Sequence, residues 1–121
     1  MPKILVIDDE PNIQKLAKAN LTARGFQVLV AADGEEGLKL AQLERPNLIL
    51  LDLRLPGMSG WDVLMILKTD RKLQKIPVII MTATVPQSEE SKFLAMRTAG
   101  YLVKPFDINE MMRQVRLAIG K

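Results

Sequence analysis

Hydrophobic residues gather in five short runs along the chain, and more polar segments separate them. The runs are rich in Val, Ile and Leu, which is typical of strands buried on both faces of a sheet. They predict strands near residues 3–8, 27–32, 47–52, 77–82 and 100–103. The intervening segments predict helices near residues 11–24, 35–44, 60–69, 88–97 and 107–119. Strict alternation of strand and helix predicts a parallel sheet with right-handed crossovers and helices on both faces.

Local signals support the ends of these helices. Pro11 occupies an early position in the first helix, where its missing N–H costs little, and Gly25 ends that helix. Ser59, Ser88 and Asp107 are predicted N-caps of the third, fourth and fifth helices. The apolar face of the first helix is predicted to comprise Ile13, Leu16, Ala17 and Leu21.

The chain has 121 residues, which suits one domain with one hydrophobic core. No linker, repeat or low-complexity stretch interrupts the alternation, and the last predicted helix runs almost to Lys121. We therefore expect residues 1–121 to form a single domain.

The amino-acid composition excludes several kinds of chemical site. The chain contains no Cys and no His, which excludes disulfides, thiolate metal sites and phosphohistidine. Its 17 basic and 14 acidic residues give a net charge of +3, but they are dispersed and form no basic stripe, so we expect no direct binding of nucleic acid. Neither a signal-like N-terminus nor an apolar stretch of about 20 residues is present, which indicates a cytoplasmic protein outside the membrane.

Four hydrophobic runs stop at polar residues that can bind a phosphoryl group. These residues are Asp8 with Asp9, Asp52, Thr82 and Lys104. The carboxyl ends of parallel strands lie along one edge of a sheet, and ligands of open α/β sheets bind at that edge. Each ending alone has a simpler interpretation as a cap, a turn or a solvated charge, but the ordered set favours a common functional site.

The carboxylates in this set indicate a metal site. Two unit charges about 4 Å apart repel by roughly 4 kcal/mol at an effective dielectric constant near 20. A cluster of Asp8, Asp9 and Asp52 is therefore tolerable only if a cation neutralises it or one of its members is protonated. Among cations, Mg²⁺ suits oxygen ligands that leave places for water and phosphate. Lys104, the Thr82 hydroxyl and the backbone N–H of Ala83 can contact phosphoryl oxygens.

The same set indicates which atom receives a phosphoryl group. Ser and Thr need a general base, and the chain has no His to serve as one. A carboxylate is already nucleophilic at neutral pH, and Asp8 with Asp9 are more useful to the metal. Asp52 is therefore the best candidate, and an aspartyl phosphate would be the product.

The motifs resemble the receiver domain of two-component response regulators, the family of CheY-like proteins. They are VIDDE with Asp8 and Asp9, LILLDLRLPGMSG with Asp52, PVIIMTA with Thr82, and YLVKPF with Lys104. The resemblance covers the whole chain and implies a flavodoxin-like (βα)5 fold with strand order 2-1-3-4-5. One departure lies before the fifth strand, where family members often carry a Gly-Ala pair and this chain has MRTAG at residues 96–100.

The resemblance also assigns roles in the site. Asp52 would accept the phosphoryl group from a histidine kinase or a phosphotransfer protein. Asp9, Asp52 and the backbone carbonyl of Arg54 would bind Mg²⁺ or Mn²⁺ directly, with Asp8 acting through water. Thr82 and Lys104 would contact the phosphoryl oxygens.

Further residues would control the switch and its lifetime. Thr82 and Tyr101 would move together and change the face made by the fourth helix, the fifth strand and the fifth helix, which would bind a downstream partner. Arg54 and Thr84 would tune the lifetime of the phosphoryl group, although both positions also suit simple solvation. The peptide bond before Pro105 would be cis. The domain would be a monomer or a phosphorylation-dependent dimer.

Three other interpretations fit parts of the pattern. The chain could be the receiver half of a longer DNA-binding regulator, which sequence beyond Lys121 would decide. A metal-dependent phosphatase would usually have a second acid two residues after its nucleophile, where this chain has Arg54. A flavin site would need a first loop that cradles phosphate, whereas Asp8, Asp9 and Glu10 would repel it. We expect a signalling domain, with self-phosphorylation and self-dephosphorylation as its only chemistry.

Overall fold

A computed structural model describes residues 1–83 and 98–120 of the chain. The predicted helix near 88–97, its Ser88 cap and Thr84 lie outside the described residues. The strands are β1 (Lys3–Ile7), β2 (Gln27–Ala31), β3 (Leu48–Asp52), β4 (Val78–Thr82) and β5 (Gly100–Val103). The helices are α1 (Pro11–Ala23), α2 (Gly34–Glu44), α3 (Gly60–Thr69) and α5 (Ile108–Ile119). Every one of these elements begins and ends within one residue of its prediction.

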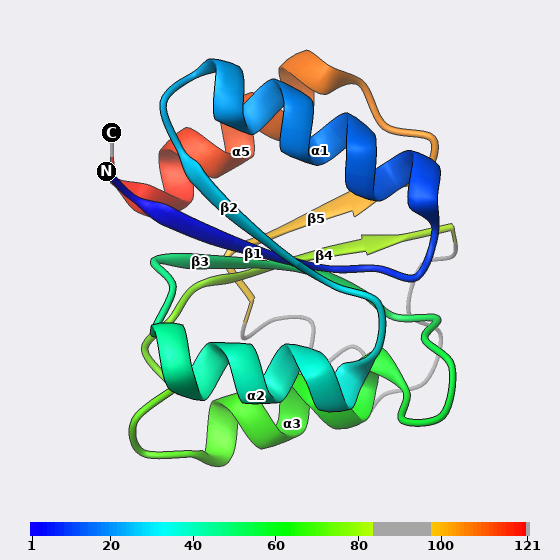
Figure 1. Ribbon diagram of the computed structural model, residues 1–121, viewed down its shortest axis with the longest axis vertical. Coiled ribbons are helices and arrows are strands. Elements are labelled where there is room, and N and C mark those ends of the chain that lie inside the picture. The colour runs from blue at the N-terminus through cyan, green and yellow to red at the C-terminus, as the bar shows by residue number, and fades with distance from the viewer. Residues whose placement is uncertain (84–97, 121) are drawn as a thin grey trace.

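The strands form one parallel sheet in the order β2-β1-β3-β4-β5 (Figure 1). This order confirms the predicted flavodoxin-like topology. The register pairs Ile7 at the end of β1 with Leu51, next to Asp52 in β3. In β4, Thr82 pairs with Val103 at the end of β5. The strands therefore end nearly level with one another, and the residues at or just after their carboxyl ends share one edge of the sheet.

Helices cover both faces of the sheet, as the alternation predicted. Helices α1 and α5 lie on one face, and α2 and α3 lie on the other (Figure 1). The core under the first layer includes Leu21 of α1, Met111 of α5 and Val6 of β1. The core under the second layer includes Leu64 of α3 and Leu51 of β3. Side chains of β1, β3 and β4 alternate between the two layers, and this explains why their sequences are apolar throughout.

Short polar side chains begin three of the helices. The side chains of Asp33, Ser59 and Asp107 accept backbone N–H bonds at the starts of α2, α3 and α5, with donor–acceptor distances of 2.8, 3.2 and 2.6 Å. On α1 the predicted apolar face needs one correction, because Leu16 is 39 % exposed while Ala17 and Leu21 are buried. Among the described helices, none combines the length and apolar character needed to cross a membrane.

Strand β5 lies at one edge of the sheet, and a side chain of α5 covers part of that edge. The Gln114 carboxamide accepts a hydrogen bond from the Tyr101 backbone N–H at 3.0 Å and donates one to the Tyr101 carbonyl at 3.1 Å. Gly100 allows this approach, because a Cβ atom there would lie 2.2 Å from the Gln114 side-chain oxygen. Gln114 thus joins α5 to β5 beside Tyr101.

Candidate functional site

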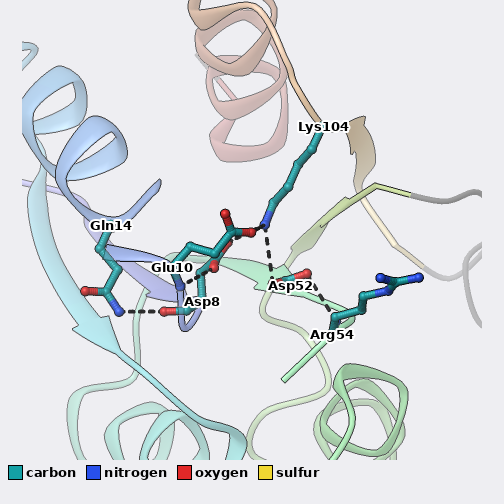
Figure 2. A network of polar contacts seen from close by, with 6 residues as sticks. All are labelled: Asp8, Glu10, Gln14, Asp52, Arg54 and Lys104. Carbon is teal, nitrogen blue, oxygen red and sulfur yellow. Dashed lines mark hydrogen bonds and ion pairs between the residues drawn. The ribbon is translucent and has the colours of Figure 1, made fainter. Parts of the chain in front are cut away.

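Side chains from three strand ends meet at the carboxyl edge of the sheet. Asp8 follows β1, Asp52 is the last residue of β3, and Lys104 follows β5. The side chain of Lys104 reaches across to the two aspartates and to Glu10 (Figure 2). The structure therefore brings together residues that are as many as 96 positions apart in the sequence.

Lys104 is the positive centre of this group. Its Nζ lies 2.9 Å from Oδ2 of Asp8, 2.9 Å from Oε1 of Glu10 and 3.3 Å from Oδ2 of Asp52. The Asp8 side chain is fully buried, and those of Asp52 and Lys104 are 5 % and 11 % exposed. Because these charges are largely shielded from water, their mutual attraction is stronger than that of a surface ion pair.

Backbone groups hold both aspartates in place. One oxygen of Asp8 accepts the Glu10 N–H at 2.9 Å, and one oxygen of Asp52 accepts the Arg54 N–H at 3.1 Å. The side chain of Gln14 in α1 donates to the Asp8 carbonyl oxygen at 2.6 Å, which ties the start of α1 to the end of β1 (Figure 2). Each carboxylate therefore keeps its other oxygen directed at Lys104.

Gly60 lets the start of α3 lie against the end of β3. A Cβ atom at Gly60 would be 2.2 Å from the Asp52 carbonyl oxygen and 2.4 Å from Cα of Leu53. The Gly60 N–H donates to the Leu53 carbonyl at 3.0 Å. Only glycine fits this close approach, which fixes the backbone on both sides of the loop that follows Asp52.

The charges in the site change the acidity of its members. Burial raises the pKa of the Asp52 carboxyl group; the Asp8 carboxylate acts in the same direction, while the Arg54 N–H and Lys104 oppose it. Burial alone would lower the pKa of Lys104, but its hydrogen bonds to Asp8 and Glu10 outweigh that effect and raise it. Lys104 therefore stays charged. The Asp52 carboxyl group, because it is buried, ionises less readily than an exposed one.

The acidic oxygens form a donor set suited to a hard cation. One oxygen each from Asp8, Glu10 and Asp52 lies within 4.8 Å of the others. Carboxylate oxygens are the ligands that Mg²⁺ prefers, and the surplus of negative charge favours a divalent ion. The residues present therefore fit a magnesium site. The predicted ligand Asp9 is exposed and is outside this group of three.

Asp9 nevertheless borders the open space beside the group. A pocket of about 260 Å³ lies there, and its lining residues are Asp9, Glu10, Asp52, Arg54, Ala83 and Lys104. Five of these six residues were predicted to be part of the site. The side chain of Arg54 points away from Asp52 in Figure 2, so its backbone faces the carboxylates more closely than its guanidinium does.

Glu10 is the site residue that sequence reasoning did not assign. The sequence places Glu10 only in the acidic first loop, because it does not show how far the chain turns after β1. In the structure its side chain turns back over Asp8 to meet Lys104. The available signal was a third acid directly after Asp8 and Asp9.

The remaining predicted residues lie around this centre. Thr82 ends β4 and is 1 % exposed, and Ala83 follows it at the surface. Tyr101 is partly buried against the α2–α3 layer, and this burial raises the pKa of its phenol. The Lys104–Pro105 peptide bond is cis, as the resemblance implied.

Comparisons with known proteins agree with this fold and geometry. The family model of the response regulator receiver domain matches residues 4–116. The chain therefore belongs to that family and is a receiver domain of two-component response regulators. Receiver domains take phosphoryl groups from histidine kinases and bind Mg²⁺ at an acidic pocket.

Two curated relatives are transcriptional regulators that match this chain over about half of their own length. RpaA of Synechocystis sp., a DNA-binding dual master transcriptional regulator, is 40 % identical over 121 residues, which are 100 % of this chain and 50 % of RpaA. The transcriptional regulatory protein KdpE of Mycobacterium tuberculosis is 40 % identical over the same 121 residues, which are 52 % of KdpE. The chain thus spans about half the length of these relatives.

Solved structures of similar domains match over nearly their whole length. The receiver domain of the sensor histidine kinase PA1611 from Pseudomonas aeruginosa, solved with a magnesium ion coordinated in its active-site cleft, has 29 % identity and a TM-score of 0.87, with 99 % of this chain and 98 % of that one covered. The chemotaxis response regulator CheY4 of Vibrio cholerae has 28 % identity and a TM-score of 0.87, with 98 % of both chains covered.

Proposed function

We propose that Asp52 is the phosphoacceptor of this receiver domain. The observation that carries the proposal is the contact of Lys104 with both Asp8 and Asp52 at the carboxyl edge of the sheet. Asp52 lines the open pocket, whereas Asp8 is fully buried, so an incoming phosphorus atom can reach Asp52 more readily. The donor would be the phosphohistidine of a histidine kinase or of a phosphotransfer protein.

The transfer can be written as a balanced exchange of bonds. An oxygen of Asp52 attacks phosphorus and forms an O–P bond, while the N–P bond of phosphohistidine breaks and its electron pair stays on the imidazole. Mg²⁺ or Mn²⁺, held by Asp8, Asp9, Asp52 and the carbonyl of Arg54, would offset the negative charge of the phosphoryl oxygens and the carboxylates.

Residues of this chain would position the phosphoryl group. Lys104 would exchange one of its carboxylate contacts for a phosphoryl oxygen, and its raised pKa keeps it charged for that role. The Thr82 hydroxyl and the N–H of Ala83 would donate to the other oxygens. Arg54 and Thr84 would set how readily water reaches the phosphoryl group and therefore how long it persists.

The same group would operate a switch. Phosphorylation adds charge and acceptor oxygens at Asp52. Drawing Thr82 toward them would open space for Tyr101 to turn inward and change the surface formed by β5, α5 and the segment between β4 and β5. That surface would bind the downstream protein, with the domain acting as a monomer or as a phosphorylation-dependent dimer.

Mass measurement after incubation with Mg²⁺ and a small acyl phosphate tests the acceptor. We expect one added phosphoryl group on the unaltered domain and none on Asp52→Asn. Asp62→Asn is the matched control, because Asp62 is an exposed aspartate in the first turn of α3, and it should be phosphorylated normally. Equal labelling of Asp52→Asn and the unaltered domain would place the acceptor elsewhere.

We also propose that this receiver domain serves as part of a longer DNA-binding regulator. The support is that curated relatives such as RpaA and KdpE are about twice as long as this chain and match it over its full length. In this arrangement the receiver domain itself would not bind DNA. Sequence of the source gene beyond the codon for Lys121 tests the idea, because a stop codon there would contradict it.

A signalling role also predicts little turnover. The position two residues after Asp52 holds Arg54 instead of the second acid that a phosphatase would use. We expect at most one phosphoryl transfer per molecule, followed by slow self-dephosphorylation. Many turnovers on simple phosphoesters would favour the phosphatase instead.

A further inference from the structure

A groove lies at the end of the molecule opposite the phosphorylation site. It has a volume of about 770 Å³, and its lining residues are Lys39, Gln42, Leu43, Arg45, Asp70, Arg71, Lys72 and Leu73. These residues belong to the end of α2 and to the segment that follows α3, at the amino ends of β3 and β4. We call this surface the α2–α3 groove. In Figure 1 the end of α2 and the segment that follows α3 lie at the left of the lower layer, whereas the carboxyl ends of the strands point to the right.

The α2–α3 groove is strongly cationic. Lys39, Arg45, Arg71 and Lys72 face a single acid, Asp70, which leaves a surplus of three positive charges, as large as that of the whole chain. None of the four cations takes part in an ion pair with another residue in 1–83 or 98–120. Their charges are therefore available to an external anion.

Asp70, the one acid among the residues that line the groove, accepts hydrogen bonds from the backbone. An oxygen of Asp70 accepts the N–H of Lys72 at 2.7 Å and the N–H of Leu73 at 3.2 Å. These backbone hydrogen bonds fix the Asp70 carboxylate at the turn that follows α3. Asp70 thus shapes the turn, and its single negative charge offsets only one of the four cations.

The wall that follows α3 is fixed before any partner arrives. Leu73 is 1 % exposed and anchors the segment in the core. Lys68, at 9 % exposure, donates from Nζ to the carbonyls of Gln74 and Ile76 at 3.3 and 3.0 Å. A preformed wall lowers the entropy that a partner must lose on binding.

The opposite wall is formed by the end of α2, where the backbone takes an unusual conformation. Arg45 has a φ of +48°, in the left-handed region that favours glycine, and its N–H donates to the Ala41 carbonyl at 3.0 Å. The chain thus carries a cationic side chain at a position where glycine would be less strained. Next to it, Leu43 is 78 % exposed at the groove.

We propose that the α2–α3 groove binds an acidic peptide segment of a partner protein. Carboxylates of that segment would face Lys39, Arg45, Arg71 and Lys72, and an apolar side chain would cover Leu43. Exposed leucine next to unpaired cations suits a peptide that is both acidic and apolar. A single-stranded nucleic acid fits less well, because none of the eight lining residues is aromatic and could stack on a base.

Fluorescence anisotropy with a labelled dodecapeptide of Glu and Leu tests this binding. The double variant Lys39→Glu with Arg71→Glu should weaken binding at least about tenfold, and added salt should reduce the difference. The matched control is Lys15→Glu with Lys18→Glu, which reverses two exposed charges on α1 at another surface. The control should change affinity less than about twofold. Equal weakening by both pairs would mean general attraction to a basic protein and would overturn the proposal.

Two single variants separate a binding role from a structural one. Arg45→Gly should weaken peptide binding while leaving the melting temperature unchanged or higher, because glycine tolerates the positive φ. Leu43→Ser should weaken binding of the Glu and Leu peptide but not of a peptide in which Ala replaces Leu. Unchanged peptide affinity in both variants would contradict the assigned contacts.

Two further measurements define the partner and the independence of the surface. A single-stranded oligonucleotide should fail to displace the peptide, and displacement at lower concentration than unlabelled peptide would make the groove a nucleic-acid site instead. Asp52→Asn should bind the peptide with unchanged affinity, since the groove lies at the other end of the sheet. Peptide binding without phosphorylation of Asp52 would support the groove and contradict the phosphoacceptor. Phosphorylation of Asp52 without peptide binding would do the opposite, so the two proposals are tested separately.

Discussion

The two ends of the sheet hold charge in opposite ways. At the carboxyl ends, Asp8, Glu10 and Asp52 surround Lys104, and both aspartates are nearly out of contact with water. At the amino ends, the cations of the α2–α3 groove are exposed and face a single acid that is bound to backbone N–H groups. Buried charges depend on one another for their stability, whereas exposed charges are solvated and can be exchanged. The first arrangement suits a reaction centre and the second suits recognition.

Removal of Lys104 should have the largest effect on stability. Lys104→Met leaves two buried aspartates without their cation, and we expect a loss of about 3 kcal/mol in the free energy of unfolding. Urea denaturation without divalent ions measures it. Lys3→Met is the control at the other end of the sheet, because its 2.8 Å ion pair with Glu44 is partly exposed and should be worth no more than about 1 kcal/mol. Equal losses would erase the contrast between buried and exposed charge.

Magnesium should stabilise the protein by binding at the carboxyl ends of the strands and not at the α2–α3 groove. At ten times its dissociation constant, Mg²⁺ should raise the free energy of unfolding by about 1.4 kcal/mol, and a chelator should remove the gain. Thermal melts with and without the ion measure this shift. Asp52→Asn should lose most of it, whereas Lys39→Glu in the α2–α3 groove should keep it. A full shift in Asp52→Asn would mean that the ion binds elsewhere.

The convergence of the site was predictable because it follows from topology. Short apolar runs alternating with helices define parallel strands, and parallel strands bring Asp8, Asp52 and Lys104 to one edge. Glu10 escaped prediction because its reach depends on the turn after β1. The α2–α3 groove could not be predicted from the sequence, because it is formed by two helix ends that are distant along the chain. Its shape also depends on the positive φ of Arg45 and on the buried amine of Lys68.

A smaller effect should appear in the pH dependence of Asp52→Asn. Burial raises the pKa of Asp52 in the folded protein, so ionisation of this group opposes folding. The stability linked to its protonated form is complete below the unfolded pKa, near 3.9, and is lost as pH rises through the folded pKa. Without metal, Asp52→Asn should therefore exceed the unaltered domain in stability at pH 7, and the advantage should shrink on acidification. An advantage that grows toward low pH would contradict this sign.

The smallest effect should come from relieving the backbone at Arg45. Arg45→Gly should raise the free energy of unfolding by about 0.5 kcal/mol, because relief of the left-handed conformation is partly offset by the greater flexibility of glycine in the unfolded chain. Chemical denaturation measures it. Arg45→Ala is the control, because it removes the charge and keeps the positive φ. If Ala stabilises as much as Gly, charge repulsion and not backbone strain is the cause.

The carboxamide of Gln114 has a consequence for how copies of this domain can meet. An edge strand invites another chain to extend the sheet, because its outward N–H and C=O groups are a template for pairing. On β5 those groups at Tyr101 already bond to Gln114. A second copy that added a strand at Tyr101 would first have to break both of these hydrogen bonds and expel the Gln114 side chain.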